Sequence, residues 1–157
     1  MENQPGLGEL LRYVTDLVDS GAEKIYRDMA FTYRPRYTPI LRAMVAGAET
    51  VTDITARTWL TQGAISQSVS MMEKEDILQK HAQEDGRKSR LQLTSKGQQL
   101  VAELQPHWQT IFVAINQLEN ETGYPLLTVL QETAKALEKQ GFDERLRLAK
   151  QEQHHDE

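Results

Sequence analysis

The sequence predicts a mainly α-helical fold with one small β-hairpin, and three observations support this. Two helical patterns, 51–58 and 61–74, follow each other with almost no connection, which is typical of a helix-turn-helix. The hydrophobic period then changes from that of a helix to that of a strand in two short runs, 77–81 and 90–93. Apolar residues at helical spacing occupy both ends of the chain. We therefore expect one domain, residues 1–157.

The first helix is predicted from leucine and valine residues three and four positions apart, which is the spacing of one helix face. It covers about 7–20 and ends near Gly21. A weaker helical pattern continues over 26–33. It stops at Arg34, because a residue that precedes proline is disfavoured in the α-helical region.

The second helix is predicted over 38–46. Thr38 is a favourable N-cap, and Pro39 suits the first helical position, where its missing N–H has no helical acceptor in any case. Gly47 then ends the helix. This helix leads directly into the helix-turn-helix.

The last third of the chain is again helical. A long helix opens at Thr94 and continues through Pro106, and the chain breaks at Gly123. Helical patterns resume over 125–140 and 142–150, before a polar tail. The order is therefore helix, helix, helix-turn-helix, hairpin and C-terminal helices.

The apolar stripes of the terminal helices are larger than the small central module could cover. Exposed stripes of this kind usually pack on a partner, so we expect a homodimer. The stripes comprise Leu10, Leu11, Val14 and Leu17 near the N-terminus and Leu127, Leu130, Ala134 and Leu137 near the C-terminus.

Composition excludes several classes of function. The chain has 157 residues, a net charge of −5 and no cysteine, which excludes disulfides, thiolate zinc sites and iron–sulfur clusters. Without a secretion signal or a run of roughly 20 apolar residues, a soluble, cytoplasmic protein is expected. Residues 57–97 alone carry more basic than acidic side chains, 7 against 5, as a local nucleic-acid contact requires.

Three motifs stand out in the middle of the chain: Val51-Thr52-Asp53-Ile54-Thr55, residues 61–69, and Asp85-Gly86-Arg87 with Leu91, Leu93, Thr94 and Gly97. In these motifs the chain resembles the MarR family of winged helix-turn-helix transcription regulators. The resemblance implies a winged helix-turn-helix over 38–97 and dimerisation helices over 7–33 and 98–150. It further implies a homodimeric repressor that binds a pseudo-palindromic double-stranded DNA operator and is relieved by a small aromatic or anionic effector.

The second helix of the motif has the chemistry of a DNA-reading surface. Ile65, Val69 and Met72 share one face and must point to the core. The opposite face is small, uncharged and able to donate and accept hydrogen bonds, which suits base edges in a major groove, and Thr61 can cap the helix. The predicted DNA-contacting residues here are Thr61, Gln62, Gly63, Ser66, Gln67 and Ser70.

The turn of the hairpin matches the family's wing signature. By resemblance, Arg87 enters the minor groove and Asp85 orients its guanidinium. A narrow minor groove concentrates negative potential, which favours an arginine there. Lys88 is the predicted phosphate contact.

A cleft for an effector is the remaining site that the resemblance implies. The candidates are Tyr33, Tyr37, His107, Trp108 and Phe112, and the alternative is that these aromatic residues fill the core. The four histidines have no regular ligand spacing, and no nucleophile or acid–base motif is present. We therefore expect neither a metal, nor a cofactor, nor enzymatic activity.

Two positions depart from the family pattern. Trp59 and Asp76 stand where the family usually has glycine, so the motif turn is either reshaped or strained. Two alternative functions follow. One is an interaction protein that has the fold but has lost DNA binding, and the other is a small-molecule binder or enzyme that uses the aromatic cleft.

Overall fold

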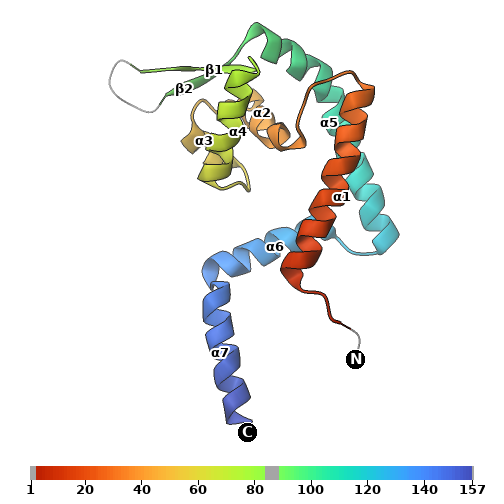
Figure 1. Cartoon of the computed structure of the whole chain (residues 1–157), viewed down its shortest axis with the longest axis vertical. Helices are drawn as coiled ribbons and strands as arrows, with labels where there is room; N and C mark the ends of the chain where they lie inside the picture. The colour runs from red at the N-terminus through yellow and green to blue at the C-terminus, as the bar shows by residue number, and fades with distance from the viewer. Residues whose placement is uncertain (1–2, 84–88, 157) are drawn as a thin grey trace. The chain divides into compact units, whose positions relative to one another are not determined.

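The computed structural model describes residues 3–83 and 89–156, and it confirms a mainly α-helical chain with one β-hairpin (Figure 1). The helices are α1 (Leu7–Asp28), α2 (Thr38–Val45), α3 (Val51–Arg57), α4 (Gln62–Lys74), α5 (Ser95–Thr122), α6 (Leu126–Lys139) and α7 (Phe142–His155), with a 3-10 turn, η1 (Pro35–Tyr37). The strands are β1 (Leu78–His81) and β2 (Arg90–Leu93). The chain divides into two compact units, and the boundary between them lies between Glu103 and Leu104.

The first unit contains the helix-turn-helix and the hairpin. Its core is formed by apolar side chains of α2, α3 and α4 and of the start of β1, each contributing roughly 1.5–3 kcal/mol by leaving water. The predicted core face of α4 is confirmed, and Ser68 is buried on it as well. The fully buried side chains of these elements are Ile40, Leu41, Ile54, Ile65, Val69, Met72, Ile77 and Leu78.

Helix α1 is longer than the sequence predicted. It continues past Gly21 to Asp28, so the expected end near residue 20 is wrong. One glycine inside a helix costs only about 1 kcal/mol, and the neighbouring turns compensate for it. The helix ends where Ala30 adopts a left-handed backbone, with φ at 61°, and the N–H of Phe31 donates to the carbonyl of Tyr26.

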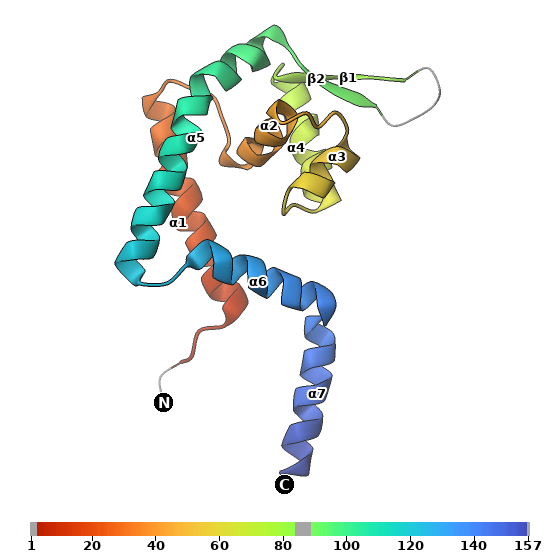
Figure 2. The same cartoon turned by 180° about the vertical axis from the view of Figure 1, so that it is seen from behind.

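The two strands form an antiparallel hairpin with the predicted boundaries to within one residue. The two strands lie side by side in Figure 2. Leu78 pairs with Leu93, and His81 pairs with Arg90. Leu78 and Leu91 face the core, whereas Gln79 and Gln92 are exposed. The period of two that predicted the hairpin is therefore seen in β2, whereas in β1 Leu78 is followed by three exposed residues.

Thr94 and Gly97 hold the start of α5 against Ile77, the residue just before β1. The Thr94 hydroxyl accepts a hydrogen bond from the Gly97 N–H at 3.0 Å and so caps α5, and the Thr94 N–H donates to the Ile77 carbonyl at 3.1 Å. A Cβ at position 97 would overlap that same carbonyl oxygen. These two residues of the signature therefore fix the start of α5 to the segment that leads into β1.

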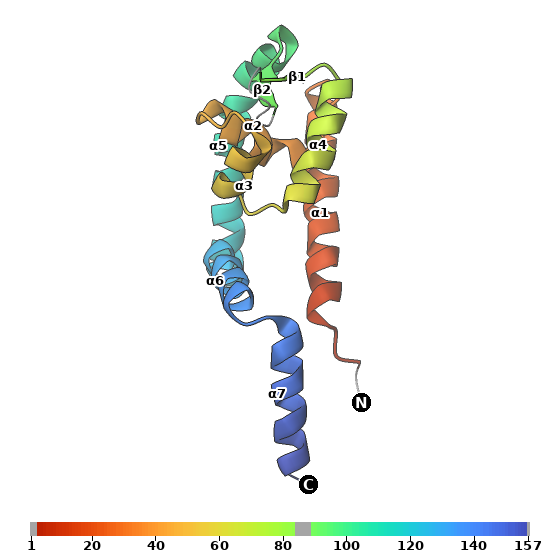
Figure 3. The same ribbon diagram turned by 90° about the vertical axis from the view of Figure 1, so that its left-hand side faces the viewer.

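The second unit comprises the rest of α5 with α6 and α7, and the loop that joins α6 to α7 can be followed in Figure 3. Arg145 closes α6, because its guanidinium donates to the carbonyls of Ala136 and Gln140 at 2.9 and 3.0 Å. Helix α7 extends to His155, so the expected polar tail is mostly helical.

Candidate nucleic-acid interface

Helix α4 begins as its sequence predicts. The Thr61 hydroxyl accepts a hydrogen bond from the Ala64 N–H at 3.2 Å, which caps the helix at Gln62. The remaining N–H groups of the first turn point out of this end, where a phosphate oxygen can accept them.

The face of α4 opposite the core is exposed and neutral. Its residues combine amide and hydroxyl groups with one glycine, and the helix carries no charged side chain before Glu73. The exposed members are the five predicted from the sequence, Gln62, Gly63, Ser66, Gln67 and Ser70. Such a surface can donate and accept at close range, which base edges in a major groove require.

The turn between α3 and α4 is reshaped and carries no left-handed residue. Thr58 is extended, at φ −131° and ψ 170°, and its hydroxyl donates to the Ile54 carbonyl at 2.8 Å. Outside glycine, the described residues with positive φ are Ala30 and Asp76. Trp59 therefore fits this turn without backbone strain, and its side chain is exposed.

Asp76 adopts a left-handed backbone conformation at a position where the family usually has glycine. Its φ is 60°, the left-handed region that aspartate tolerates better than most residues. The Thr94 hydroxyl donates to the Asp76 carbonyl at 2.5 Å, which holds the junction between α4 and β1. The direction from α4 into the wing is thus kept without glycine.

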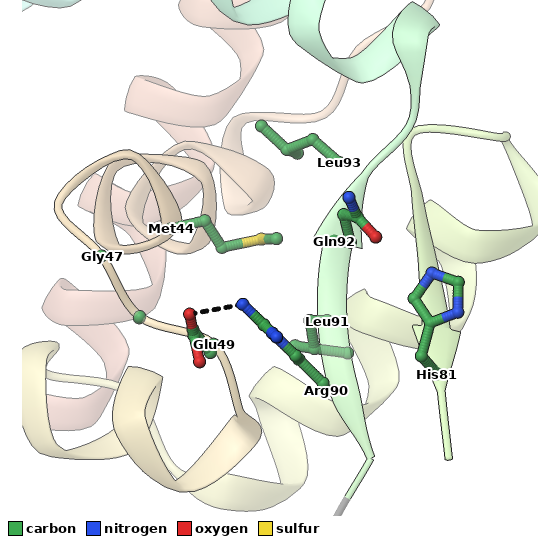
Figure 4. A pocket seen from close by; sticks show the side chains of 9 residues that line it. Met44, Gly47, Glu49, His81, Arg90, Leu91, Gln92 and Leu93 are labelled. Atoms are coloured by element: carbon green, nitrogen blue, oxygen red, sulfur yellow. Dashed lines mark hydrogen bonds and ion pairs between the residues drawn. The ribbon is translucent and has the colours of Figure 1, made fainter. Parts of the chain in front are cut away.

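The base of the wing is tied to the segment before α3, a connection that the sequence analysis missed. The Leu91 N–H donates to the Glu49 carbonyl at 2.7 Å, and the Arg90 guanidinium pairs with the Glu49 carboxylate at 2.9 Å (Figure 4). Both side chains are about half exposed, so the ion pair itself adds little stability. The pair lines a cavity of about 470 Å³ together with Met44 and His81.

Asp53 extends this connection into α3. Its carboxylate accepts the N–H groups of Glu49 at 2.9 Å and Thr50 at 3.2 Å. These hydrogen bonds, led by that from Glu49, hold the pKa of Asp53 below its usual value. The wing base and the start of the helix-turn-helix thus form one hydrogen-bonded unit.

The predicted wing contacts Asp85, Arg87 and Lys88 lie outside the described residues. Of the other cations near the hairpin, Lys80 is exposed on β1, and the Lys96 ammonium donates to the Glu75 carbonyl at 2.8 Å.

The predicted effector residues are divided between the two units. Tyr33 and Tyr37 are buried in the first unit with their rings edge-to-face at 5.7 Å, and the Tyr33 hydroxyl shares a hydrogen bond with Thr38 at 2.9 Å. Burial is the main cause that raises the pKa of Tyr37.

The remaining predicted effector residues, His107, Trp108 and Phe112, belong to the second unit. Trp108 is buried, His107 is partly exposed and Phe112 is 44% exposed.

Within residues 3–83 and 89–156, no three histidine or acidic side chains lie close enough together to hold a metal ion. No helix of the described chain combines the length and apolar character needed to cross a membrane.

Comparison with known proteins gives matches to solved structures. No protein-family model and no curated protein sequence matches the chain. BpsR of Bordetella bronchiseptica, described with regulation of its DNA binding by 6-hydroxynicotinic acid, superposes with a TM-score of 0.65 at 17% identity, over 86% of this chain and 98% of that one.

Two further matches are to complexes with DNA. MepR of S. aureus has a TM-score of 0.62 at 17% identity, over 85% of this chain and 99% of that one. The transcriptional regulator MOSR of M. tuberculosis has a TM-score of 0.63 at 14% identity, over 84% of this chain and 98% of that one. Another solved structure, from Silicibacter pomeroyi, is described as a MarR family transcriptional regulator and matches at 21% identity with a TM-score of 0.54, over 87% of this chain and 90% of that one. The capped and exposed α4, the hairpin behind it and these superpositions together show that the chain has the winged helix fold of the MarR family regulators.

Proposed function

We propose that this chain is a non-enzymatic transcription regulator of the cytoplasm that binds double-stranded DNA as a homodimer and represses the genes downstream. The observation that carries the proposal is the exposed, uncharged face of α4, capped at Thr61 and followed by the hairpin. Solved proteins of the same fold include complexes with DNA, which supports this use of the surface.

Base reading is assigned to the side chains that α4 presents. The amides of Gln62 and Gln67 can each donate and accept in one plane, as an adenine edge requires, and Ser66 tolerates either partner. A solvated helix face usually carries lysine and glutamate, and this one carries neither. The wing residues Arg87 and Lys88 supply the minor-groove and phosphate contacts.

A second copy of the chain is the partner that the terminal helices favour. Leu10, Leu11, Val14 and Leu17 are all exposed on α1, and neither α6 nor α7 buries a side chain within the described chain. Apolar stripes of this size are rarely left in water. A symmetric dimer covers them and presents two copies of α4 to half-sites about one helical turn apart.

The proposal includes an effector. A small aromatic or anionic molecule that binds the chain would relieve repression. The description of BpsR, in which 6-hydroxynicotinic acid regulates DNA binding, supports an effector of this class.

Sequencing of DNA fragments selected by the purified protein tests the proposal. We expect a pseudo-palindromic motif. Gln62→Ala and Gln67→Ala should each relax the preference at particular base pairs, whereas Lys88→Ala should weaken binding to every sequence and reduce its salt dependence. If the selected pool shows no motif, the chain is not a sequence-specific regulator.

The wing arginine can be tested by itself. Arg87→Ala should weaken operator binding by about 1–3 kcal/mol and change the free energy of unfolding by no more than about 0.5 kcal/mol. Fluorescence anisotropy with a labelled operator and urea denaturation measure the two quantities. Unchanged operator affinity would show that Arg87 does not contact DNA.

Gly63 offers a test in which stability and DNA binding move in opposite directions. A Cβ at this exposed helical position meets no atom within 4 Å, so Gly63→Ala should stabilise the free protein by about 0.5–1 kcal/mol. The same methyl group should weaken operator binding about tenfold or more, because Gly63 lies where the α4 N-terminus approaches the DNA.

Gly21→Ala is the matched control for this test. Gly21 is also helical, exposed and open around its Cβ, but it lies in α1. It should also raise the stability of the free protein, and it controls for stability alone, because Gly21 lies on the face of α1 that carries Val14 and Leu17. Unchanged operator affinity of Gly63→Ala would argue against the proposed approach of α4.

An interaction protein that has lost DNA binding is the second candidate, and the departures at Trp59 and Asp76 motivated it. Both residues fit their positions in the fold, since the motif turn contains no left-handed residue and Asp76 adopts the required conformation. The structure therefore offers no support for this candidate from the motif turn.

A further inference from the structure

Trp59 is a large apolar side chain that the first unit leaves in water. Outside α1, the exposed large apolar side chains in the described part of this unit are Val45 and Trp59, and Trp59 is the more exposed, at 58%. Tryptophan combines a broad apolar surface with one N–H donor, so it is enriched where proteins contact other molecules. The proposed dimer covers the stripe of α1, whereas Trp59 lies in the turn between α3 and α4 (Figure 3).

The backbone of this turn fixes where the indole starts. Thr58 is extended, and its hydroxyl donates to the Ile54 carbonyl at 2.8 Å, which ties the turn to α3. On the other side, Thr61 caps α4. Leu60 has no side-chain donor, so between these two anchors the indole N–H of Trp59 is the donor that the turn presents.

Trp59 lies at the edge of the surface that α4 offers to DNA. Its Cα is at most about 7 Å from the Cα of Thr61, because only two residue steps separate them. A helix about 10–12 Å across fills a major groove about 12 Å wide. A side chain just before the N-terminus of such a helix therefore lies over one of the sugar–phosphate backbones that border the groove.

The charge around the turn favours a polyanion. Residues 58–72 include no charged side chain, so no carboxylate of the turn or of the exposed face of α4 repels phosphate. Trp59 also borders a cavity of about 370 Å³ whose described lining residues include Arg42 and Arg57 and no acid. Both arginines already interact within the chain, Arg57 with the Ala46 carbonyl at 2.8 Å. The direct contact at this position therefore falls to the indole.

We propose that Trp59 contacts the DNA backbone: its indole N–H donates to a phosphate oxygen beside the N-terminus of α4, and its ring lies against the deoxyribose of that nucleotide. Glycine, the usual residue of the family at this position, could make neither contact. Because the indole is neutral and touches only the backbone, it adds affinity without sequence preference and without release of counterions. The inference rests on the proposed function, since it requires α4 to face the duplex.

Nuclear magnetic resonance of the full chain observes the contact directly. The protein has two tryptophans, and the Trp59→Phe variant assigns their two indole N–H signals. When the chain binds the duplex obtained by selection, we expect the Trp59 N–H proton to move downfield and to exchange with water about tenfold more slowly or less, because a hydrogen-bonded proton exchanges only when its bond opens. Trp108 is buried and belongs to the second unit, so its signal is the internal reference.

Variants measure what the contact contributes. Trp59→Ala should weaken binding about tenfold or more, by the same factor for the selected duplex and for a scrambled duplex of equal length. The salt dependence of binding should stay as it is in the unmodified chain. Trp59→Phe retains a ring without the donor and should recover only part of the loss.

Val45→Ala is the matched control, because it removes the other exposed apolar side chain of this unit outside α1. It should bind both duplexes as the unmodified chain does. Since Trp59 is exposed, Trp59→Ala should remain folded, which circular dichroism checks.

Three results would overturn the proposal while the unmodified chain binds the selected duplex. The first is equal affinity of Trp59→Ala and the unmodified chain. The second is a Trp59 N–H that exchanges as fast in the complex as in the free protein. The third is a loss of affinity confined to the selected duplex, since Trp59 would then read a base. Absence of binding by the unmodified chain to either duplex would instead contradict the proposed function, and with it any DNA contact of Trp59.

Discussion

Gly97→Ala should lower the free energy of unfolding by about 3 kcal/mol, the upper end of the cost of inserting one methyl group into a packed site. The added Cβ would overlap the Ile77 carbonyl oxygen, which is backbone and cannot rotate away. The overlap is relieved only if the start of α5 moves away from Ile77, the residue just before β1. That shift would strain the hydrogen bond from the Thr94 N–H to the same carbonyl.

Urea denaturation measures this loss, and Gly21→Ala is again the control because its Cβ meets open space. At a temperature where Gly97→Ala remains folded, its operator affinity per folded molecule should stay close to that of the unmodified chain. Equal stabilities of the two variants would show that the backbone at position 97 can yield. The glycine of the wing signature would then need another explanation.

The elements whose signals are local could be predicted from the sequence to within a residue or two. Thr61 caps α4, and exposed and buried residues alternate at Arg90, Leu91 and Gln92 of β2, because capping and periodicity depend on neighbours along the chain. The end of α1 was misjudged because one glycine is a weak stop signal when the residues around it favour helix.

The contacts that frame the candidate interface are long-range and were not predictable. Glu49 and Arg90 are 41 positions apart, and each looks like an ordinary surface charge in the sequence. The same holds for the cavity at Trp59, since Arg42 of α2 meets the motif turn only after α2 and α3 have packed. For Trp59 the sequence raised the right question, whether the turn is reshaped or strained, and the backbone angles answer it.

Leu130→Glu should separate the two copies of the proposed dimer. Leu130 lies on the apolar stripe of α6 and is 39% exposed in the single chain, so Leu130→Glu should leave the chain folded by circular dichroism. In a symmetric dimer the substitution occurs twice, and each copy loses the burial of a leucine and gains a charge to desolvate. We therefore expect the dimer to be weakened by at least about 3 kcal/mol, roughly a hundredfold or more in dissociation constant.

Sedimentation equilibrium and operator binding should change together, since two half-sites are held by two linked copies of α4. Gln131→Glu is the matched control. It adds the same charge at the next position of α6, where the side chain is exposed and polar, and it should leave both measurements unchanged. If the unmodified protein sediments as a monomer at micromolar concentration, the stripes do not serve dimerisation. The operator would then lose its reason to be palindromic, because a monomer presents a single α4 to a single half-site.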